Sequence, residues 1–410
     1  MLPGGKSVLF AASNGSGQGG LRILTLNDGK VKTIIENTTH GRYLSGHLIY
    51  YREGTLFAAP MNADRLVITG PPVPLVQGVS NTGNWRRAEF DLSSNGTLVY
   101  RGGSAGTSFV LSWLDSAGKT VPVISKPGQY GSPSLSPDGS RLALSVIQEG
   151  KQNLWVYDLR RETLNRLTSD ADPVMLPTWT RDGEYLAFRS GNALAWKRSD
   201  GSGKTEYLAG VSPNAGPWSF SADGKWLAFW PLEDGSDLWI APVERKPGLL
   251  KMGQPQLLLQ QAGSKGAPAI SPDGRWVAYT SNESGRFEIY VMPFSPQGRA
   301  VGQKWLVSNG GGTGPIWSHN GRELFYQSLD RRIGVAAYAV RGDSFVAEKA
   351  RHWSETRLVD TGYFSSFDVA RDGKHVVAMF AAEDSRAATL VRVLLHVDGE
   401  LRRRLPAFAR

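Results

Sequence analysis

The sequence predicts an all-β fold, a single β-propeller built from four-stranded antiparallel blades. Three observations predict it: a short turn motif recurs nine times, each copy is followed by further strand-like segments, and no long amphipathic helix is present. Successive copies lie about 40–50 residues apart, which is the length of one four-stranded blade. Nine blades in one ring are expected, with eight as the alternative if the two ends merge or one unit is irregular.

The repeats place the whole chain, residues 1–410, in one β-propeller domain. They start near residues 1, 40, 86, 130, 175, 214, 265, 313 and 363. The chain begins at the first of these turns, without the strand that precedes the others, and the last unit lacks its outermost strand. We therefore expect the closure of the ring to be weakest at the termini.

The recurring motif has the chemistry of a tight turn between two antiparallel strands. In Ser136-Pro137-Asp138-Gly139, Pro presets φ at the second position and Gly accepts a positive φ at the fourth. The strand after each turn is apolar on both faces and carries a small residue, as expected where one sheet packs between two others. Asp273, in the equivalent stretch SPDGRWVAYTSNESGRFEIYVMPF, is therefore interpreted as a turn residue rather than a catalytic group.

A second pair of strands follows the first pair in each unit. Examples are NLWVYDL with NRLT and EIYVMPF with KWLVS. Each repeat thus reads strand, turn, strand, loop, strand, turn, strand. The stretch at 381–397 is ambiguous, because its first half favours a helix; its second half, TLVRVLLHV, is interpreted as a strand.

The composition excludes several classes of function. The chain has no cysteine, which excludes thiol catalysis, thiolate metal sites and disulfides. No apolar run is long enough to cross a membrane, and no signal peptide is recognised in this chain. The net charge is +9, but outside a cluster at Arg402–Arg404 the Lys and Arg are scattered in ones and twos, which favours solvated surface charge over nucleic-acid binding.

The repeats resemble the TolB-type propeller repeat, whose mark is S-P-D-G-x-x-[LVI]-A-[FY]. The resemblance covers nearly the whole chain and is strongest at 132–330. Segments 52–79, 271–294 and 308–328 are similar to the propeller that follows the membrane segment in some bacterial serine/threonine kinases, and to its stand-alone relatives. The resemblance implies a periplasmic or otherwise extracytoplasmic sensing or scaffold module. The motifs of the kinase domain itself are absent from this sequence.

Two kinds of motif, one typical of a hydrolase nucleophile and one typical of a phosphate-binding loop, occur without the helix that each requires. The GxSxG match at 102–106 is followed by a strand, whereas a hydrolase nucleophile elbow needs a helix there. The GKT triplets at 118–120 and 203–205 lack the first glycine and the helix of a phosphate-binding loop. All three segments are interpreted as hairpin loops.

Metal ligands are sparse along the sequence. The six His show no zinc spacing, and His319 occupies a slot in one of the recurring turns. Asp170 with Asp172, and Asp234 with Asp237, offer oxygen ligands to calcium, but solvated loops are the preferred interpretation. Neither a metal nor a cofactor is assigned.

A binding surface is expected where the loops enter the innermost strands, because these loops surround one mouth of a propeller channel and differ between the repeats. The candidate ligand- or partner-binding residues are Trp85, Arg86, Tyr130, Met175, Asn214, Lys265, Thr313 and Tyr363. Aromatic, basic and amide groups of this kind suit a sugar, a peptide or a partner protein. The alternative is that these side chains only fill the channel.

The sequence therefore predicts a non-enzymatic β-propeller binding or scaffold module, acting as an extracytoplasmic sensor or a protein-interaction platform. Its partner would be a protein or a cell-envelope sugar or peptide. The alternative is a propeller hydrolase or lyase with its site at the channel mouth, which a convergence of three or more acidic or His side chains would favour. A third possibility is a structural spacer without a ligand.

Overall fold

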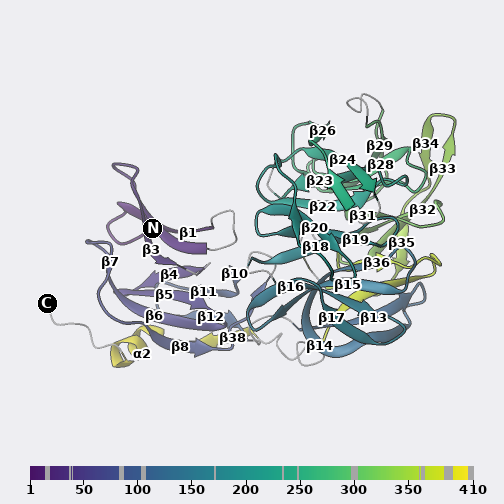
Figure 1. Cartoon of the computed structure of the whole chain (residues 1–410). Helices are drawn as coiled ribbons and strands as arrows, with labels where there is room; N and C mark the ends of the chain where they lie inside the picture. The colour runs from purple at the N-terminus through teal and green to yellow at the C-terminus, as the bar shows by residue number, and fades with distance from the viewer. Residues whose placement is uncertain are drawn as a thin grey trace. The chain divides into compact units, whose positions relative to one another are not determined.

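The computed structural model (Figure 1) describes the whole chain except residues 14–18, 37, 39, 83–86, 103–107, 170–171, 233–234, 247–248, 297–302, 360, 362–364, 383–390 and 405–410. The all-β prediction is confirmed, and the strands pair in antiparallel sheets. The chain divides into two compact units. Unit 1 comprises Met1–Ser108 and Ala381–Arg410, and unit 2 comprises Phe109–Phe380.

Unit 2 is a ring of antiparallel sheets, here called blades 1 to 6, and each blade has its first strand innermost. In the described residues, blade 1 contains β14 (Thr120–Leu135), β15 (Arg141–Gln148), β16 (Lys151–Asp158) and β17 (Thr163–Arg166). Blade 2 contains β18 (Val174–Trp179), β19 (Tyr185–Ser190), β20 (Ala193–Arg198) and β21 (Glu206–Tyr207). Blade 3 contains β22 (Ala215–Phe220), β23 (Trp226–Pro231), β24 (Leu238–Lys246), β25 (Leu249–Met252) and β26 (Gln256–Leu259).

Blades 4 and 5 continue the same pattern, and blade 6 combines strands from the two ends of unit 2. Blade 4 contains β27 (Lys265–Ile270), β28 (Trp276–Ser281), β29 (Glu288–Pro293) and β30 (Trp305–Leu306). Blade 5 contains β31 (Thr313–Trp317), β32 (Glu323–Gln327), β33 (Ile333–Arg341), β34 (Ser344–Ala347) and β35 (Arg351–Ser354). Blade 6 contains β36 (Phe367–Val369), β37 (His375–Ala381), β13 (Phe109–Asp115) and the first part of β14.

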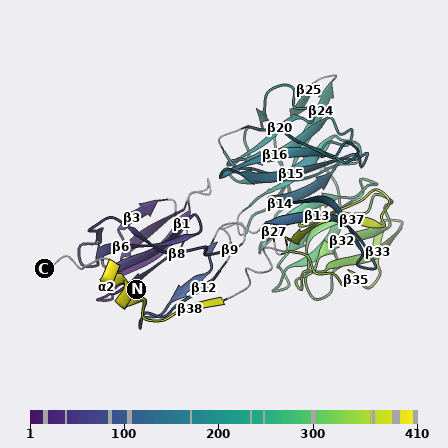
Figure 2. The ribbon, with the colours of Figure 1, turned by 90° about the horizontal axis from the view of Figure 1, so that it is seen from below.

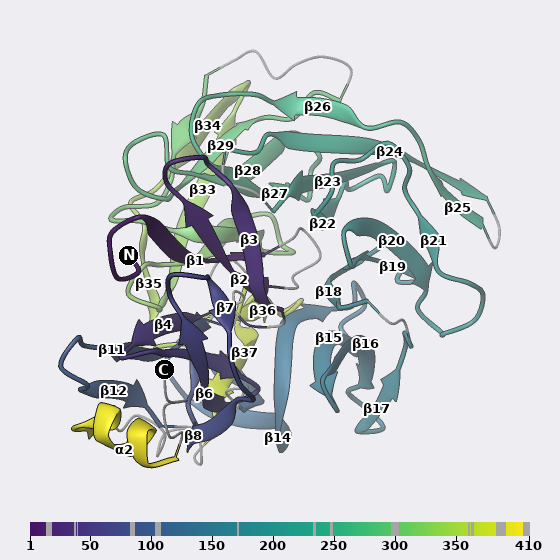
Figure 3. The same ribbon diagram turned by 90° about the vertical axis from the view of Figure 1, so that its left-hand side faces the viewer.

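The ring closes because β14 belongs to two blades. Its first part pairs with β13, and β13 lies beside β37 in blade 6 (Figure 2). Its second part pairs with β15 and forms the inner strand of blade 1. Figure 3 shows β14 as one long strand. The inner strands β14, β18, β22, β27, β31 and β36 contact one another in this order, and β36 contacts β14 again.

The strand pairing does not confirm a single ring of nine blades. In the described residues, six inner strands close a ring within unit 2, and the strands of the first repeats form sheets in unit 1. The repeat that starts near residue 86 is shared between the units, because β11 and β12 stay in unit 1 while β13 and β14 complete blade 6. The outer strands that the last repeat lacked are therefore supplied from earlier in the chain.

The recurring turns fold as their sequence predicts. In the turn at Ser271, the Ser271 hydroxyl donates to the Asp273 carboxylate and accepts a hydrogen bond from the backbone N–H of Trp276 at 3.0 Å. Gly274 has φ +69°, a value that glycine adopts without strain. The same contacts recur at Ser136 and Asp138. Asp273 is thus a turn residue, as predicted.

The small residues that follow these turns let neighbouring blades pack closely. Ala143, Ala187, Ala228 and Ala278 are fully buried in the second strands of blades 1 to 4. Clusters of buried apolar side chains lie between successive blades, as when Ala278 packs with residues of blade 5. The hydrophobic core of the ring is therefore a series of layers between sheets.

Unit 1 contains three larger sheets and one short pair of strands. Within its described residues, the first sheet contains β1 (Ser7–Ser13), β2 (Gly19–Thr25) and β3 (Val31–Glu36), and the second contains β4 (Gly41–Leu44), β5 (His47–Arg52), β6 (Thr55–Asn62), β7 (Val67–Ile68) and β8 (Val73–Gln77). The third sheet contains β11 (Phe90–Leu92), β12 (Leu98–Arg101) and β38 (Val391–Leu394). The short pair is β9 (Asn81–Thr82) with β10 (Arg87–Ala88). The strand interpretation of the segment before residue 397 is confirmed by β38.

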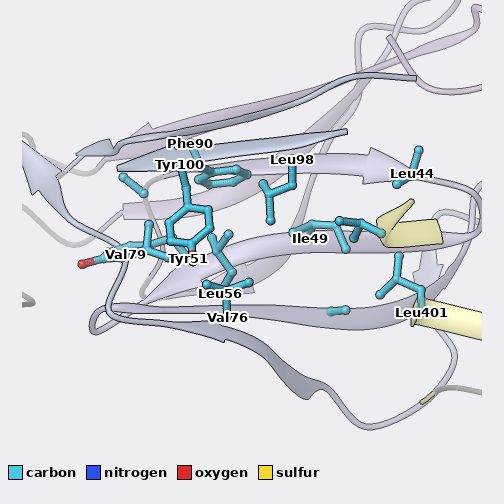
Figure 4. Close-up of a cluster of buried hydrophobic side chains, with 13 residues drawn as sticks. Leu44, Ile49, Tyr51, Leu56, Val76, Val79, Phe90, Leu98, Tyr100 and Leu401 are labelled. Carbon is cyan, nitrogen blue, oxygen red and sulfur yellow. The ribbon is translucent and has the colours of Figure 1, made fainter. Parts of the chain in front are cut away.

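A helix that the sequence did not indicate, α2 (Val397–Arg404), packs on unit 1. Val397 and Leu401, one turn apart, are buried with Tyr51, Phe90 and other apolar residues, and Figure 4 shows Leu401 directed into this cluster. Acidic residues in the first turn favour the helix N-terminus electrostatically. Among the described residues, no helix has the length and apolar character needed to cross a membrane.

Candidate functional site

A cavity of about 210 Å³ lies at the centre of the ring in unit 2. All six inner strands contribute to its lining. One residue of each occupies the same repeat position, two places before the turn: Ser134, Thr178, Ser219, Ala269, Ile316 and Asp368. Three tryptophans, Trp179, Trp218 and Trp317, also line the cavity. The central cavity is therefore the candidate functional site.

Five of the inner strands contain a proline. These strands tolerate proline because, where it lies, they pair with a neighbouring strand on one side only. The five that share this location are Pro133, Pro177, Pro217, Pro268 and Pro315. A proline has no N–H to donate and is tolerated on an edge strand. Each of these strands also has an irregular register with its neighbour near the proline. Such bulges bend a strand and redirect its side chains.

Hydrogen bonds tie successive inner strands together around the cavity. The indole N–H of Trp179 donates to the Ser134 carbonyl at 2.9 Å, and the hydroxyl of Ser219 accepts from the backbone N–H of Ile270 at 2.8 Å. The indole N–H of Trp218 donates to the Pro315 carbonyl at 3.4 Å, which links blade 3 to blade 5. Trp218 therefore spans part of the cavity.

Asp368 joins the last inner strand to the first. Its carboxylate accepts hydrogen bonds from the backbone N–H of Leu135 at 2.7 Å and of Val369 at 2.8 Å. The side chain is half-buried in the wall of the cavity, and desolvation by the neighbouring protein raises the pKa of Asp368 to about 6, although the two N–H groups act in the opposite direction. Asp368 is the titratable group that sequence reasoning missed.

The end of the cavity at the turns carries basic side chains. Arg181 and His319, each the second residue of a turn, line it. His319 is exposed, but partial desolvation by its neighbours lowers the pKa of its ring, and the positive charges of Arg181 and Arg371 lower it further. A hydrogen bond to the backbone of Val369 acts the other way. This end differs from the mouth that the sequence singled out.

The predicted binding residues at the other mouth do not line the cavity. Tyr130 is buried and its hydroxyl donates to the Lys126 carbonyl at 3.1 Å. The Asn214 side-chain oxygen accepts from Arg189 at 2.7 Å. Met175 and Thr313 are half-buried at the starts of β18 and β31. The binding role of these residues stays a prediction.

The ammonium group of Lys265 is buried, and its binding role likewise stays a prediction. The side chain is fully buried. It donates to the carbonyl of Gly263 at 2.9 Å and to that of Gln261, and it lies 3.6 Å from the Asp237 carboxylate. A lysine at this place stabilises the loop before β27. Three other candidates, Trp85, Arg86 and Tyr363, lie outside the described residues.

Comparison with known proteins agrees with this architecture. Residues 104–246 match the family described as the TolB β-propeller domain. This segment consists of TolB-like propeller repeats. It includes the inner strands of blades 1 to 3, which line the cavity, and the ring is called the TolB-like ring below. The rest of the ring repeats the same strand order.

Individual relatives match parts of the chain. An uncharacterized peptidase, YuxL, of Bacillus subtilis (strain 168) is 27% identical over 45% of this chain and 28% of its own length. An uncharacterized protein, YidR, of Escherichia coli (strain K12) is 30% identical over 27% of each chain. The chain thus spans less than a third of the length of these curated relatives. The solved structure of a putative TolB from Agrobacterium tumefaciens has a TM-score of 0.48 at 18% identity, covering 68% of this chain and 99% of that chain.

The TolB-like ring shows no metal centre in its described part. Nowhere among the described residues do three His, Asp or Glu side chains gather as a metal site would require. Of the acidic pairs that could offer ligands to calcium, Asp170 and Asp234 lie outside the described residues. Asp172 is exposed, and Asp237 accepts a hydrogen bond from Gln260 at 3.2 Å.

We expect Asp368 to make the stability of the TolB-like ring depend on pH. Because the pKa of Asp368 is about 6 in the folded protein and ordinarily 3.8, folding favours the protonated acid. The contribution of Asp368 to the free energy of unfolding is fully present below about pH 4 and is lost as pH rises through 6. The loss in the free energy of unfolding is at most ~3 kcal/mol, and less to the extent that cavity water solvates the carboxylate.

Urea unfolding at several pH values between 4 and 7 measures this effect in the parent protein and in Asp368→Asn. The difference between the two free energies should fall as pH rises, because the variant lacks the titrating group. Asp343→Asn removes an exposed carboxylate and controls for the loss of one charge. A difference that stays constant across this pH range would contradict the prediction.

Proposed function

We propose that the ring is a non-enzymatic binding module that takes a ligand, or part of a protein partner, into its central cavity. The observation that carries this proposal is the cavity itself, to which all six inner strands contribute and whose lining as a whole combines aromatic rings with aliphatic and polar groups. Binding sites for small ligands have this composition. We further propose an extracytoplasmic sensor or interaction platform, which the resemblance of the repeats supports.

The size of the cavity limits what it holds. Its volume of about 210 Å³ is below the range of roughly 300–1,000 Å³ typical of drug-sized ligands. It corresponds to about seven water molecules at ~30 Å³ each. A side chain, a chain end or one sugar unit fits this volume, and an extended oligosaccharide does not. This favours a short protruding group of a protein or cell-envelope ligand.

One observation favours the second candidate, a hydrolase or lyase. A carboxyl group with a pKa near 6, such as Asp368, is suited to general acid–base catalysis. Its two oxygens, however, already accept backbone N–H groups that join the first and last inner strands. A ring-closing role accounts for these contacts, so binding is the function we favour.

A thermal-shift screen of the purified chain tests the proposal. The panel holds short peptides, peptidoglycan fragments and oligosaccharides, and a ligand at 100 times its Kd adds about 2.7 kcal/mol of stability. We expect Trp218→Ala to abolish the shift of a cavity ligand, because Trp218 lines and spans the cavity. Trp155→Ala is the matched control, since Trp155 is half-buried in β16 and does not line the cavity.

The outcomes separate the candidates. A shift that Trp218→Ala removes and Trp155→Ala preserves supports binding in the cavity. A shift that survives both substitutions places the ligand elsewhere and contradicts the proposal. Turnover of a peptide or glycan in the panel that disappears in Asp368→Asn would establish the enzyme instead.

A further inference from the structure

The second residue of each turn is the variable position around one end of the cavity. The third and fourth residues are fixed by the turn itself, through a carboxylate or amide and a positive φ, and the first residue supplies a hydroxyl in every turn except that of Ala370. The second residues, in blade order, are Pro137, Arg181, Ala222, Pro272, His319 and Arg371. The first five of them line the cavity. Three of the six are basic and the other three are uncharged.

The basic residues converge although they come from different blades. Arg181 lies in blade 2 and His319 in blade 5, on opposite sides of the ring, and both line the same cavity. Arg371 lies in blade 6, next to blade 5. The charges of both arginines act on the His319 ring. Arg181 and His319 therefore line one volume at the turn end, and the charge of Arg371 reaches the His319 ring from the neighbouring blade.

The carboxylates beside these residues are engaged elsewhere. Asp182, next to Arg181, pairs with Arg245 and accepts from the Thr180 hydroxyl at 2.7 Å. Asp372, next to Arg371, lies 2.6 Å from the His375 ring. The residue after His319 is an uncharged Asn.

Within the described residues, neither Arg181 nor Arg371 forms an ion pair. Other arginines of the ring do, as Arg332 does with Asp330 and with Glu355 at 3.2 Å. Asp368 also lines this cavity, but its two oxygens accept the backbone N–H groups of Leu135 and Val369. Like charges that converge repel one another, and an anion bound between them reduces this cost. Guanidinium groups also present a planar fork of donors that matches a carboxylate or a phosphate.

We propose that Arg181, His319 and Arg371 form a binding site for an anionic group, a carboxylate or a phosphate, at the turn end of the cavity. This inference rests on the proposed binding function and names the chemical class of the group that the ring receives. The volume of the cavity admits one such group on a short stem, such as an acidic side chain or a chain end.

The test uses the full chain at low ionic strength, where such a site binds most tightly. Isothermal titration measures three probes: inorganic phosphate, a short peptide rich in Asp and Glu, and a neutral peptide of the same length with Asn and Gln. We expect the acidic peptide or phosphate to bind and the neutral peptide to bind at least 10-fold more weakly. Comparison of phosphate with the acidic peptide distinguishes the two sources of the anion.

Variants locate the site. Arg181→Ala and Arg371→Ala should each weaken binding of the anionic probe by about 10-fold, as expected for the loss of one charge-assisted contact. Arg160→Ala removes the same charge from an exposed turn and should leave binding unchanged. Equal weakening in all three variants would indicate only a general charge effect and overturn the inference, as would an absence of binding by both anionic probes.

The two proposals can fail separately. If a neutral ligand binds in a manner sensitive to Trp218→Ala while the anionic probes do not bind, the binding function stands and the anion site is wrong. If anionic probes bind with full sensitivity to Arg181→Ala but none to Trp218→Ala, the anion site stands, and binding inside the cavity does not.

Discussion

A fragment of residues 109–382 is expected to fold into the six-bladed ring, whereas residues 130–382 are expected not to form a cooperative fold. Both fragments contain the six repeats that start at residues 130 to 363. Only the longer one contains β13 and the first part of β14, which complete blade 6. Without them, blade 6 keeps two strands, β36 and β37, and two strands alone are at best marginally stable.

The missing strands also carry buried core residues. Leu111 and Leu114 of β13 are fully buried, and the loss of each such side chain costs roughly 2–5 kcal/mol. Near-ultraviolet circular dichroism and urea unfolding measure the difference between the fragments, with the full chain as reference. Equal cooperative transitions in the two fragments would show that β13 is not needed to close the ring.

Trp276→Ala is expected to lower the free energy of unfolding of the ring by about 3–5 kcal/mol. Trp276 is buried in β28 and packs against Trp305, with ring centroids 5.4 Å apart, and against Phe345 at 5.5 Å. The substitution leaves a large cavity between blades 4 and 5. Hydrogen exchange of blade 4 amides at increasing urea concentration measures the effect without interference from unit 1.

Trp276→Phe is the matched control for that substitution. The indole N–H of Trp276 is buried without a hydrogen-bond partner among the described residues. Phe keeps an aromatic ring and removes this unsatisfied donor, so its cost should stay below about 1.5 kcal/mol. A loss as large as that of Trp276→Ala would show that the size of the indole, rather than an aromatic side chain as such, is required there.

The local structure of the ring could be predicted from the sequence because each turn encodes its own geometry. The spacing of Ser, Asp and Gly around Ser271 and Ser136 determines a hairpin, and the alanines after the turns indicate sheets packed on both faces. Ring closure could not be predicted in this way. The strands of one repeat are chemically interchangeable with those of another, so nothing local distinguishes β37 pairing with β13 from a ninth blade.

The site was harder to predict than the fold. Lys265 and Tyr130 attracted attention as polar or aromatic residues in variable loops, but both are buried and bonded within the protein. From the sequence, His319 is interpreted as a turn residue, and Arg181 occupies the same position in another turn. The signal that could have identified them is the alternation of proline, alanine and basic residues at the only turn position that the hairpin leaves free.

The insertion of unit 2 into the third sheet of unit 1 affects the order of events during protein synthesis. Arg101 ends β12 and Val391 begins β38, which are 290 residues apart. At about 5–20 residues per second, β12 leaves the ribosome roughly 15–60 s before its partner strand. A loose loop of that length would be entropically costly to close. The folded ring removes much of this cost, because the N–H of Ala382 donates to the Ser108 carbonyl at 3.0 Å and holds the two connecting segments together. Unit 1 is therefore completed last, after the strands of the ring have been synthesised.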